Sequence, residues 1–116
     1  MTRRTIAAVQ AAYYLPTAIA PFVSRRLFER VTGPKREWWL VLTVGSLVGT
    51  VGAVLAVAAR DEPQPEIVLL GAGSATVLGT IDVVYVLRRR ISPVYLLDAA
   101  FELPLAAAWL ASARHG

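Results

Sequence analysis

Cysteine is absent from the 116-residue chain, and histidine occurs once, at position 115. The lack of cysteine excludes a disulfide framework, an iron–sulfur cluster and a thiolate nucleophile. With a single histidine we expect neither a zinc site nor a histidine-dependent catalytic triad, and no Gly-rich phosphate-binding loop is present. The sequence therefore predicts no metal site and no cofactor.

Charged residues are also scarce, at 17% of the chain against about 25% in ordinary soluble domains. Thr5–Ser24 and Trp38–Ala59 contain no Asp, Glu, Lys, Arg or His at all. About 20 apolar residues are needed to cross a hydrocarbon core roughly 30 Å thick. The scarcity of charge therefore predicts an integral membrane protein in contact with the lipid bilayer. The basic residues lie in loops between apolar segments, a pattern that indicates membrane topology and not nucleic-acid binding.

Four apolar segments are long enough to span a membrane, at about residues 5–24, 38–59, 66–87 and 94–111. In a bilayer every backbone polar group needs a partner within the protein, and segments of this length provide it as helices. Pro63 precedes the third segment and Pro93 the fourth, at positions where a helix tolerates proline because no N–H is needed. We therefore predict an all-α fold, an integral membrane four-helix bundle that forms one domain over residues 1–116.

Five different short segments, spread along the chain, carry a resemblance: Tyr13-Tyr14-Leu15, Phe28–Lys35, Trp39–Gly45, Ile81–Val86 and Ile91–Asp98. In these motifs the sequence resembles a family of small bacterial four-span membrane proteins with no assigned activity, so the resemblance implies architecture only. In size and number of spans the chain is also similar to DoxX-like proteins and to small multidrug-resistance transporters. Those transporters carry a coupling glutamate in the first helix, whereas Thr5–Ser24 contains no acid.

An even number of spans places both termini on the same side of the membrane. The first and third loops hold eight of the 12 basic residues. They are Arg25, Arg26, Arg30, Lys35, Arg36, Arg88, Arg89 and Arg90. An excess of positive charge marks the cytoplasmic side. We therefore predict that both termini lie outside, and the resemblance to bacterial proteins implies the bacterial cytoplasmic (inner) membrane. The first loop is interpreted mainly as this topology signal, although Leu27, Phe28 and Val31 also allow a short amphipathic helix at the interface.

Three acids inside the apolar segments are the most informative residues: Asp82, Asp98 and Glu102. A charged side chain at the centre of a membrane helix costs about 2.5–3.5 kcal/mol on insertion scales. Asp98 and Glu102 are four residues apart and share one helix face, which Tyr95 extends. Because acids close together in a low dielectric cannot all stay ionised, at least one is expected to hold a proton. These acids are the predicted anchors of a functional site.

Polar residues that could donate hydrogen bonds to these acids lie on the first and third segments. Gln10, Tyr13, Tyr14 and Thr17 follow helical spacing on one face of the first segment. The predicted ligand-binding set is Asp98, Glu102, Asp82, Tyr95, Tyr13, Tyr85, Gln10 and Thr17. A purely structural alternative stays open. Arg25, Arg88 or Arg89 would then form an ion pair with Asp82, and Asp98 would simply accept hydrogen bonds from Tyr13, Tyr85 or Thr17.

Small residues are spaced to let helices approach closely. Gly45, Gly49 and Gly52 form one stripe in the second segment, and Gly71, Ala75 and Gly79 form another in the third. We predict that the second and third segments pack against each other through these stripes. The alternative is a homodimer through the Gly45/Gly49 face or the Gly71/Gly79 face.

The leading functional hypothesis is a bundle with an acid-lined polar cavity that binds or transports a small cationic or amphiphilic ligand, with proton coupling as an option. The first alternative is a membrane-embedded isomerase or hydratase that uses an Asp/Glu pair on a lipid-like substrate. The second alternative is a structural or accessory subunit. Whether the chain is an enzyme is left open by the sequence.

Overall fold

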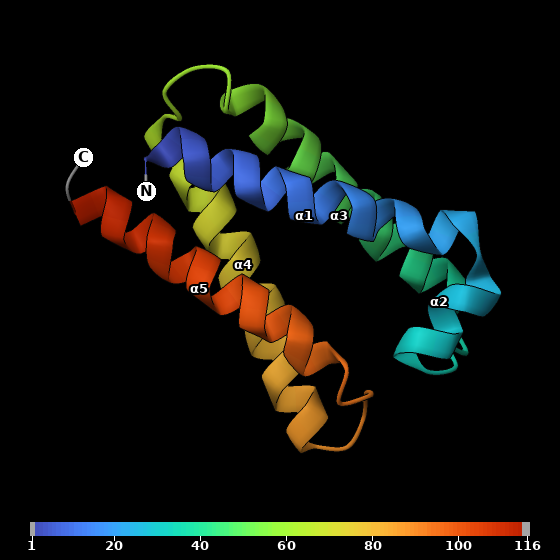
Figure 1. Ribbon diagram of the computed structural model, residues 1–116. Coiled ribbons are helices and arrows are strands. Elements are labelled where there is room, and N and C mark those ends of the chain that lie inside the picture. The colour runs from blue at the N-terminus through green and yellow to red at the C-terminus, as the bar shows by residue number, and fades with distance from the viewer. Residues whose placement is uncertain (1, 115–116) are drawn as a thin grey trace.

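The structure is a computed structural model that describes residues 2–114, and helix is the only regular secondary structure within them (Figure 1). The five helices, in chain order, are α1 (Arg3–Val23), α2 (Arg25–Thr32), α3 (Trp38–Ala58), α4 (Pro65–Leu87) and α5 (Tyr95–Arg114). The four long helices begin and end within three residues of the predicted segments. The predicted all-α fold with four long apolar helices is confirmed, and α2 is added to it.

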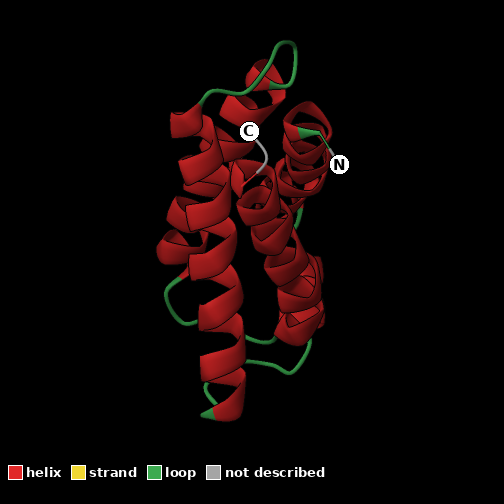
Figure 2. Cartoon of the chain, turned by 90° about the vertical axis from the view of Figure 1, so that its left-hand side faces the viewer, coloured by secondary structure: helices red, strands yellow, loops and turns green. Residues whose placement is uncertain are grey.

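The long helices have the dimensions of membrane spans. They contain 20–23 residues, which at a rise of about 1.5 Å per residue gives roughly 30–35 Å. The connecting loops gather at the two ends of these helices (Figure 2). Large apolar side chains stay exposed along them, including Leu47 on α3, Leu69 on α4 and Leu110 on α5. Apolar surface of this extent is expected where lipid covers a protein.

The long helices pack as two pairs, α1 with α3 and α4 with α5. The pairs meet at the end that holds the start of α1 and the end of α5, and they diverge toward α2 and the α4–α5 turn (Figure 1). At the meeting end all four long helices contribute to one buried apolar core. Ile6, Leu55, Val68 and Trp109 are its largest members from α1, α3, α4 and α5, respectively. The core closes this end of the molecule and leaves the other end open between the pairs.

The glycine stripe of α3 packs against α1, so the prediction that it would meet α4 was wrong. A Cβ atom at Gly52 would lie 3.1 Å from Tyr14 Cβ, and one at Gly45 would lie 3.2 Å from the Ala18 carbonyl oxygen. Such spacing lets the backbones of α1 and α3 approach closely. The glycines signal a close neighbour, but they do not encode which helix provides it.

The stripe of α4 packs against α5. A Cβ atom at Gly79 would lie 2.8 Å from Leu103 Cδ2, and one at Gly71 would lie 2.5 Å from Trp109 Cε2. Both stripes are therefore occupied by helices of the same chain. This overturns the alternative of a homodimer through the Gly45/Gly49 or Gly71/Gly79 faces, because a second copy would have to displace α1 or α5.

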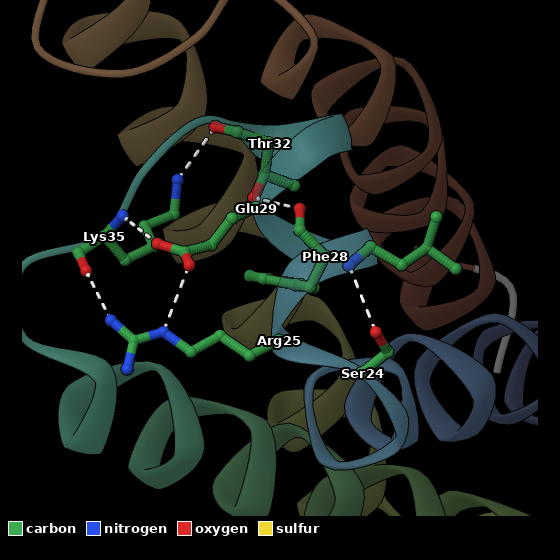
Figure 3. A network of polar contacts seen from close by, with 7 residues as sticks. Ser24, Arg25, Phe28, Glu29, Thr32 and Lys35 are labelled. Carbon is green, nitrogen blue, oxygen red and sulfur yellow. Dashed lines mark hydrogen bonds and ion pairs between the residues drawn. The ribbon is translucent and has the colours of Figure 1, made fainter.

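Helix α2 folds the first loop into a defined shape (Figure 3). It begins where the Ser24 side chain accepts a hydrogen bond from Leu27 N at 3.1 Å, and it ends at Gly33, whose φ of 95° favours glycine. The Glu29 carboxylate accepts from the Lys35 backbone N–H at 2.6 Å and from Arg25 Nε at 3.1 Å. The loop after α2 is thus fastened back onto the helix.

The hydrogen bonds that hold this loop against α2 need the Glu29 carboxylate, so their strength depends on pH. The hydrogen bond from the Lys35 N–H, together with the nearby Arg25 guanidinium, lowers the pKa of Glu29 below its ordinary value. A lowered folded-state pKa stabilises the fastened loop above the unfolded pKa of about 4.3, and this contribution is lost as pH falls through the folded-state pKa.

Glu29→Gln is expected to speed hydrogen exchange of the Lys35 amide at neutral pH. Wild type should lose the same protection in acid, after correction for intrinsic exchange, whereas equal protection in the two proteins at neutral pH would contradict the role of Glu29.

Candidate functional site

A hollow of about 520 Å³ lies between the diverging helix pairs. Its walls are mostly apolar and include Val44 and Val48 of α3 and Leu78 and Ile81 of α4. Phe28 of α2 lines it at the open end of the molecule. The polar part of the lining holds the three intramembrane acids. The hollow is therefore less polar than predicted, and its charge is concentrated on one group of side chains.

Tyrosines of α1 hold the two acids of α5. The Tyr14 hydroxyl donates to Glu102 Oε1 at 2.7 Å, and the Tyr13 hydroxyl donates to Asp98 Oδ1. Glu102 and Tyr14 are buried, whereas Asp98 and Tyr13 are partly exposed. The four-residue spacing of the acids places both on the face of α5 that meets α1. These two hydrogen bonds tie one helix pair to the other.

All three acids line the hollow, Asp82 from α4 and Asp98 and Glu102 from α5. Carboxyl groups gathered in a hollow of low dielectric cannot all stay ionised without a cation beside them, so at least one is expected to hold a proton. The arrangement can therefore hold a proton or a cation. It lacks the geometry of a metal-ion site within the described residues.

Asp82 differs from the other two acids because it has no donor of its own. The residue is 6% exposed, and within residues 2–114 its Oδ2 is buried without a hydrogen-bond partner. The alternative of an ion pair from Arg25, Arg88 or Arg89 was wrong. Within residues 2–114 the only ion pair joins Arg25 to Glu29, and the Arg88 guanidinium lies over the ring of Tyr85, 6.0 Å from its centre.

The other predicted site residues divide into two groups. Thr17 and Tyr95 line the hollow, although the Thr17 hydroxyl donates to the Tyr13 carbonyl at 2.7 Å and Lys35 Nζ lies 5.2 Å from the centre of the Tyr95 ring. Gln10 and Tyr85 do not line it. Gln10 lies in the closed core and Tyr85 is 40% exposed.

Gln10 belongs to a buried polar contact that the sequence reasoning missed. Its Oε1 accepts a hydrogen bond from Trp109 Nε1 at 2.6 Å, and its Nε2 donates to the Gly71 carbonyl at 3.1 Å. Three helices are thereby joined just beyond the hollow. The available signal was Trp109 itself, because a buried indole N–H needs an acceptor and Gln10 is the polar side chain at matching depth on α1.

No family model, curated protein or solved structure matches the chain. No family is therefore identified, and the resemblance to small bacterial membrane proteins stays a prediction. The helices define the class: this is a small multi-pass α-helical membrane protein.

Proposed function

We propose that the hollow binds a small amphiphile whose cationic or hydrogen-bond-donating head contacts the acids and whose apolar body lies along the walls. The observation that carries this proposal is the unpartnered Oδ2 atom of buried Asp82. Leaving a buried acceptor unsatisfied costs about 1–3 kcal/mol. An intramembrane acid kept at that cost favours a functional role.

The hydrogen bonds that each acid makes indicate different roles for the three acids. Asp98 and Glu102 already accept hydrogen bonds from Tyr13 and Tyr14, so they are supporting groups. Asp82 has a free acceptor and is the main anchor, which reverses the roles that the sequence suggested. The apolar residues around the acids suit a ligand with a hydrocarbon or aromatic body.

The position of the hollow favours binding from one side. The core around Ile6, Leu55 and Trp109 closes the meeting end of the helix pairs, whereas the other end is bordered by α2 and the start of α5. Transport across the membrane would require this core to open. Binding is therefore the function that the geometry supports best, and carriage of the ligand is a further step that the same site permits.

Asp82→Asn tests the proposal directly. The purified protein in nanodiscs is expected to bind tetraphenylphosphonium, an apolar permanent cation, in a titration calorimeter. Asp82→Asn keeps the size of the side chain and removes its ability to ionise beside a bound cation, so affinity should fall at least about tenfold, equivalent to ~1.4 kcal/mol.

Two controls accompany this measurement. Glu66→Gln removes an exposed acid from the first turn of α4 and should leave binding unchanged. Triphenylphosphine oxide, a neutral analogue of the probe, should bind more weakly than the cation. Equal binding of the two probes by wild type, or full affinity in Asp82→Asn, would refute the anchoring role and favour an accessory subunit.

A further inference from the structure

Helix α2 carries an apolar row and a basic row, and both are exposed. Leu27 and Val31 are one turn apart and are 58% and 56% exposed. Arg26 and Arg30, also one turn apart, are exposed on a neighbouring side of the helix, about 100° around its axis from the apolar row. An exposed apolar row flanked by a basic row is the pattern of a helix that lies in the plane of a membrane surface.

The contacts that hold the loop after α2 in place do not use the charges of Arg26, Arg30 and Arg36. Glu29 is engaged by Arg25 and by the Lys35 backbone, and no ion pair within the described residues involves Arg26, Arg30 or Arg36. The α2 end of the molecule therefore carries basic side chains whose charge is not neutralised by the protein.

A second basic segment borders the same opening. Arg88, Arg89 and Arg90 form the turn between α4 and α5, at the diverging end of the helix pairs (Figure 1). The two segments approach each other, because Lys35 Nζ lies 5.2 Å from the centre of the Tyr95 ring and a Cβ atom at Gly33 would lie 3.9 Å from Ser92 Cβ. Eight basic residues and only two acids, Glu29 and Glu37, lie on these two loops.

We propose that α2 and the α4–α5 turn together form a binding surface for anionic phospholipid headgroups. Leu27 and Val31 enter the acyl-chain region, while Arg26 and Arg30 extend to the phosphate groups with their aliphatic stems along the interface. Guanidinium groups suit phosphate because they donate paired hydrogen bonds. Val31 also lines the hollow, but the arginines of this surface do not, so the failure of one proposal would leave the other standing.

Native mass spectrometry of the purified protein distinguishes this surface from a topology signal, which acts only during insertion. Phosphatidylglycerol is expected to be retained in preference to phosphatidylcholine of the same chain length. A basic residue near the surface strengthens anionic-lipid binding about fivefold, so Arg26→Gln/Arg30→Gln should weaken phosphatidylglycerol binding about 25-fold. Salt at about 1 M should reduce the wild-type preference, because the screening length falls to about 3 Å.

The matched control removes two exposed arginines from the opposite end, Arg60→Gln/Arg114→Gln, and should keep the preference. A second variant, Arg88→Gln/Arg90→Gln, tests the other segment and spares Arg89, whose φ of 58° makes its backbone conformation sensitive to substitution. Equal retention of the two lipids by wild type would overturn the proposal. So would equal losses in the control and in Arg26→Gln/Arg30→Gln.

Discussion

Replacing Gly71 by alanine is expected to destabilise the protein by about 1–3 kcal/mol or more, the usual effect of overpacking a close-packed interior. The new methyl group would lie 2.5 Å from Trp109 Cε2 and even closer to Nε1. Trp109 is fully buried, and its indole N–H is held by Gln10. The ring has no free direction in which to move without breaking that hydrogen bond. Thermal unfolding in detergent, followed by circular dichroism, measures the loss.

Gly73 provides the matched control on the same helix. A Cβ atom there would meet nothing within 4 Å, so Gly73→Ala tests helix propensity alone. Alanine is favoured over glycine in a helix interior by up to about 1 kcal/mol. Gly73→Ala should therefore unfold at the same temperature as wild type or above it. A Gly71→Ala variant as stable as Gly73→Ala would show that Trp109 does not pack against α4 as described.

The membrane spans were predictable because their signal is local. A run of apolar residues long enough to cross the bilayer restricts each segment to a helix, whatever its neighbours are. The acids were also identifiable from position alone, since an unneeded charge is costly in that environment. Their convergence needed the fold. Asp82 and Asp98 belong to different helices, and only the pairing of α4 with α5 brings both to the lining of one hollow.

The pairing itself was beyond the sequence argument. Gly52 and Gly71 each indicate that something approaches closely, but the identity of the neighbour depends on shapes supplied by other helices. Tyr14 occupies the space beside Gly52, and Trp109 occupies the space beside Gly71. The role of Asp82 was missed for a related reason. Tyr13 and Tyr14 are far from all three acids in the sequence. Only the packing shows that they donate to Asp98 and Glu102 and that, within residues 2–114, Asp82 is left without a donor.

Tyr14→Phe is expected to cost about 1–2 kcal/mol of stability. Hydrogen bonds between membrane helices contribute about 0.6 kcal/mol on average, with a maximum near 1.7. The Tyr14–Glu102 bond should lie at the upper end, because Glu102 is only 2% exposed and no other hydrogen bond within residues 2–114 reaches its carboxyl group. Phenylalanine keeps the ring in place, so the loss reports the hydroxyl group alone. Unfolding with increasing sodium dodecyl sulfate measures the difference.

The double variant Tyr14→Phe/Glu102→Met separates the contribution of the Tyr14–Glu102 hydrogen bond from the cost of burying the Glu102 carboxyl group. Replacing both partners of a buried polar pair by apolar groups of similar volume is often neutral or stabilising, so the double variant should recover most of what Tyr14→Phe loses. Glu102→Met alone should cost less than Tyr14→Phe, because a tyrosine hydroxyl is cheaper to leave without a partner than a carboxyl group. If the two single losses simply add, the hydroxyl and the carboxyl are not coupled. The double-mutant cycle thus decides between two roles for the Tyr14–Glu102 hydrogen bond between α1 and α5. Either the bond adds net stability, or it only offsets the cost of burying the Glu102 carboxyl group.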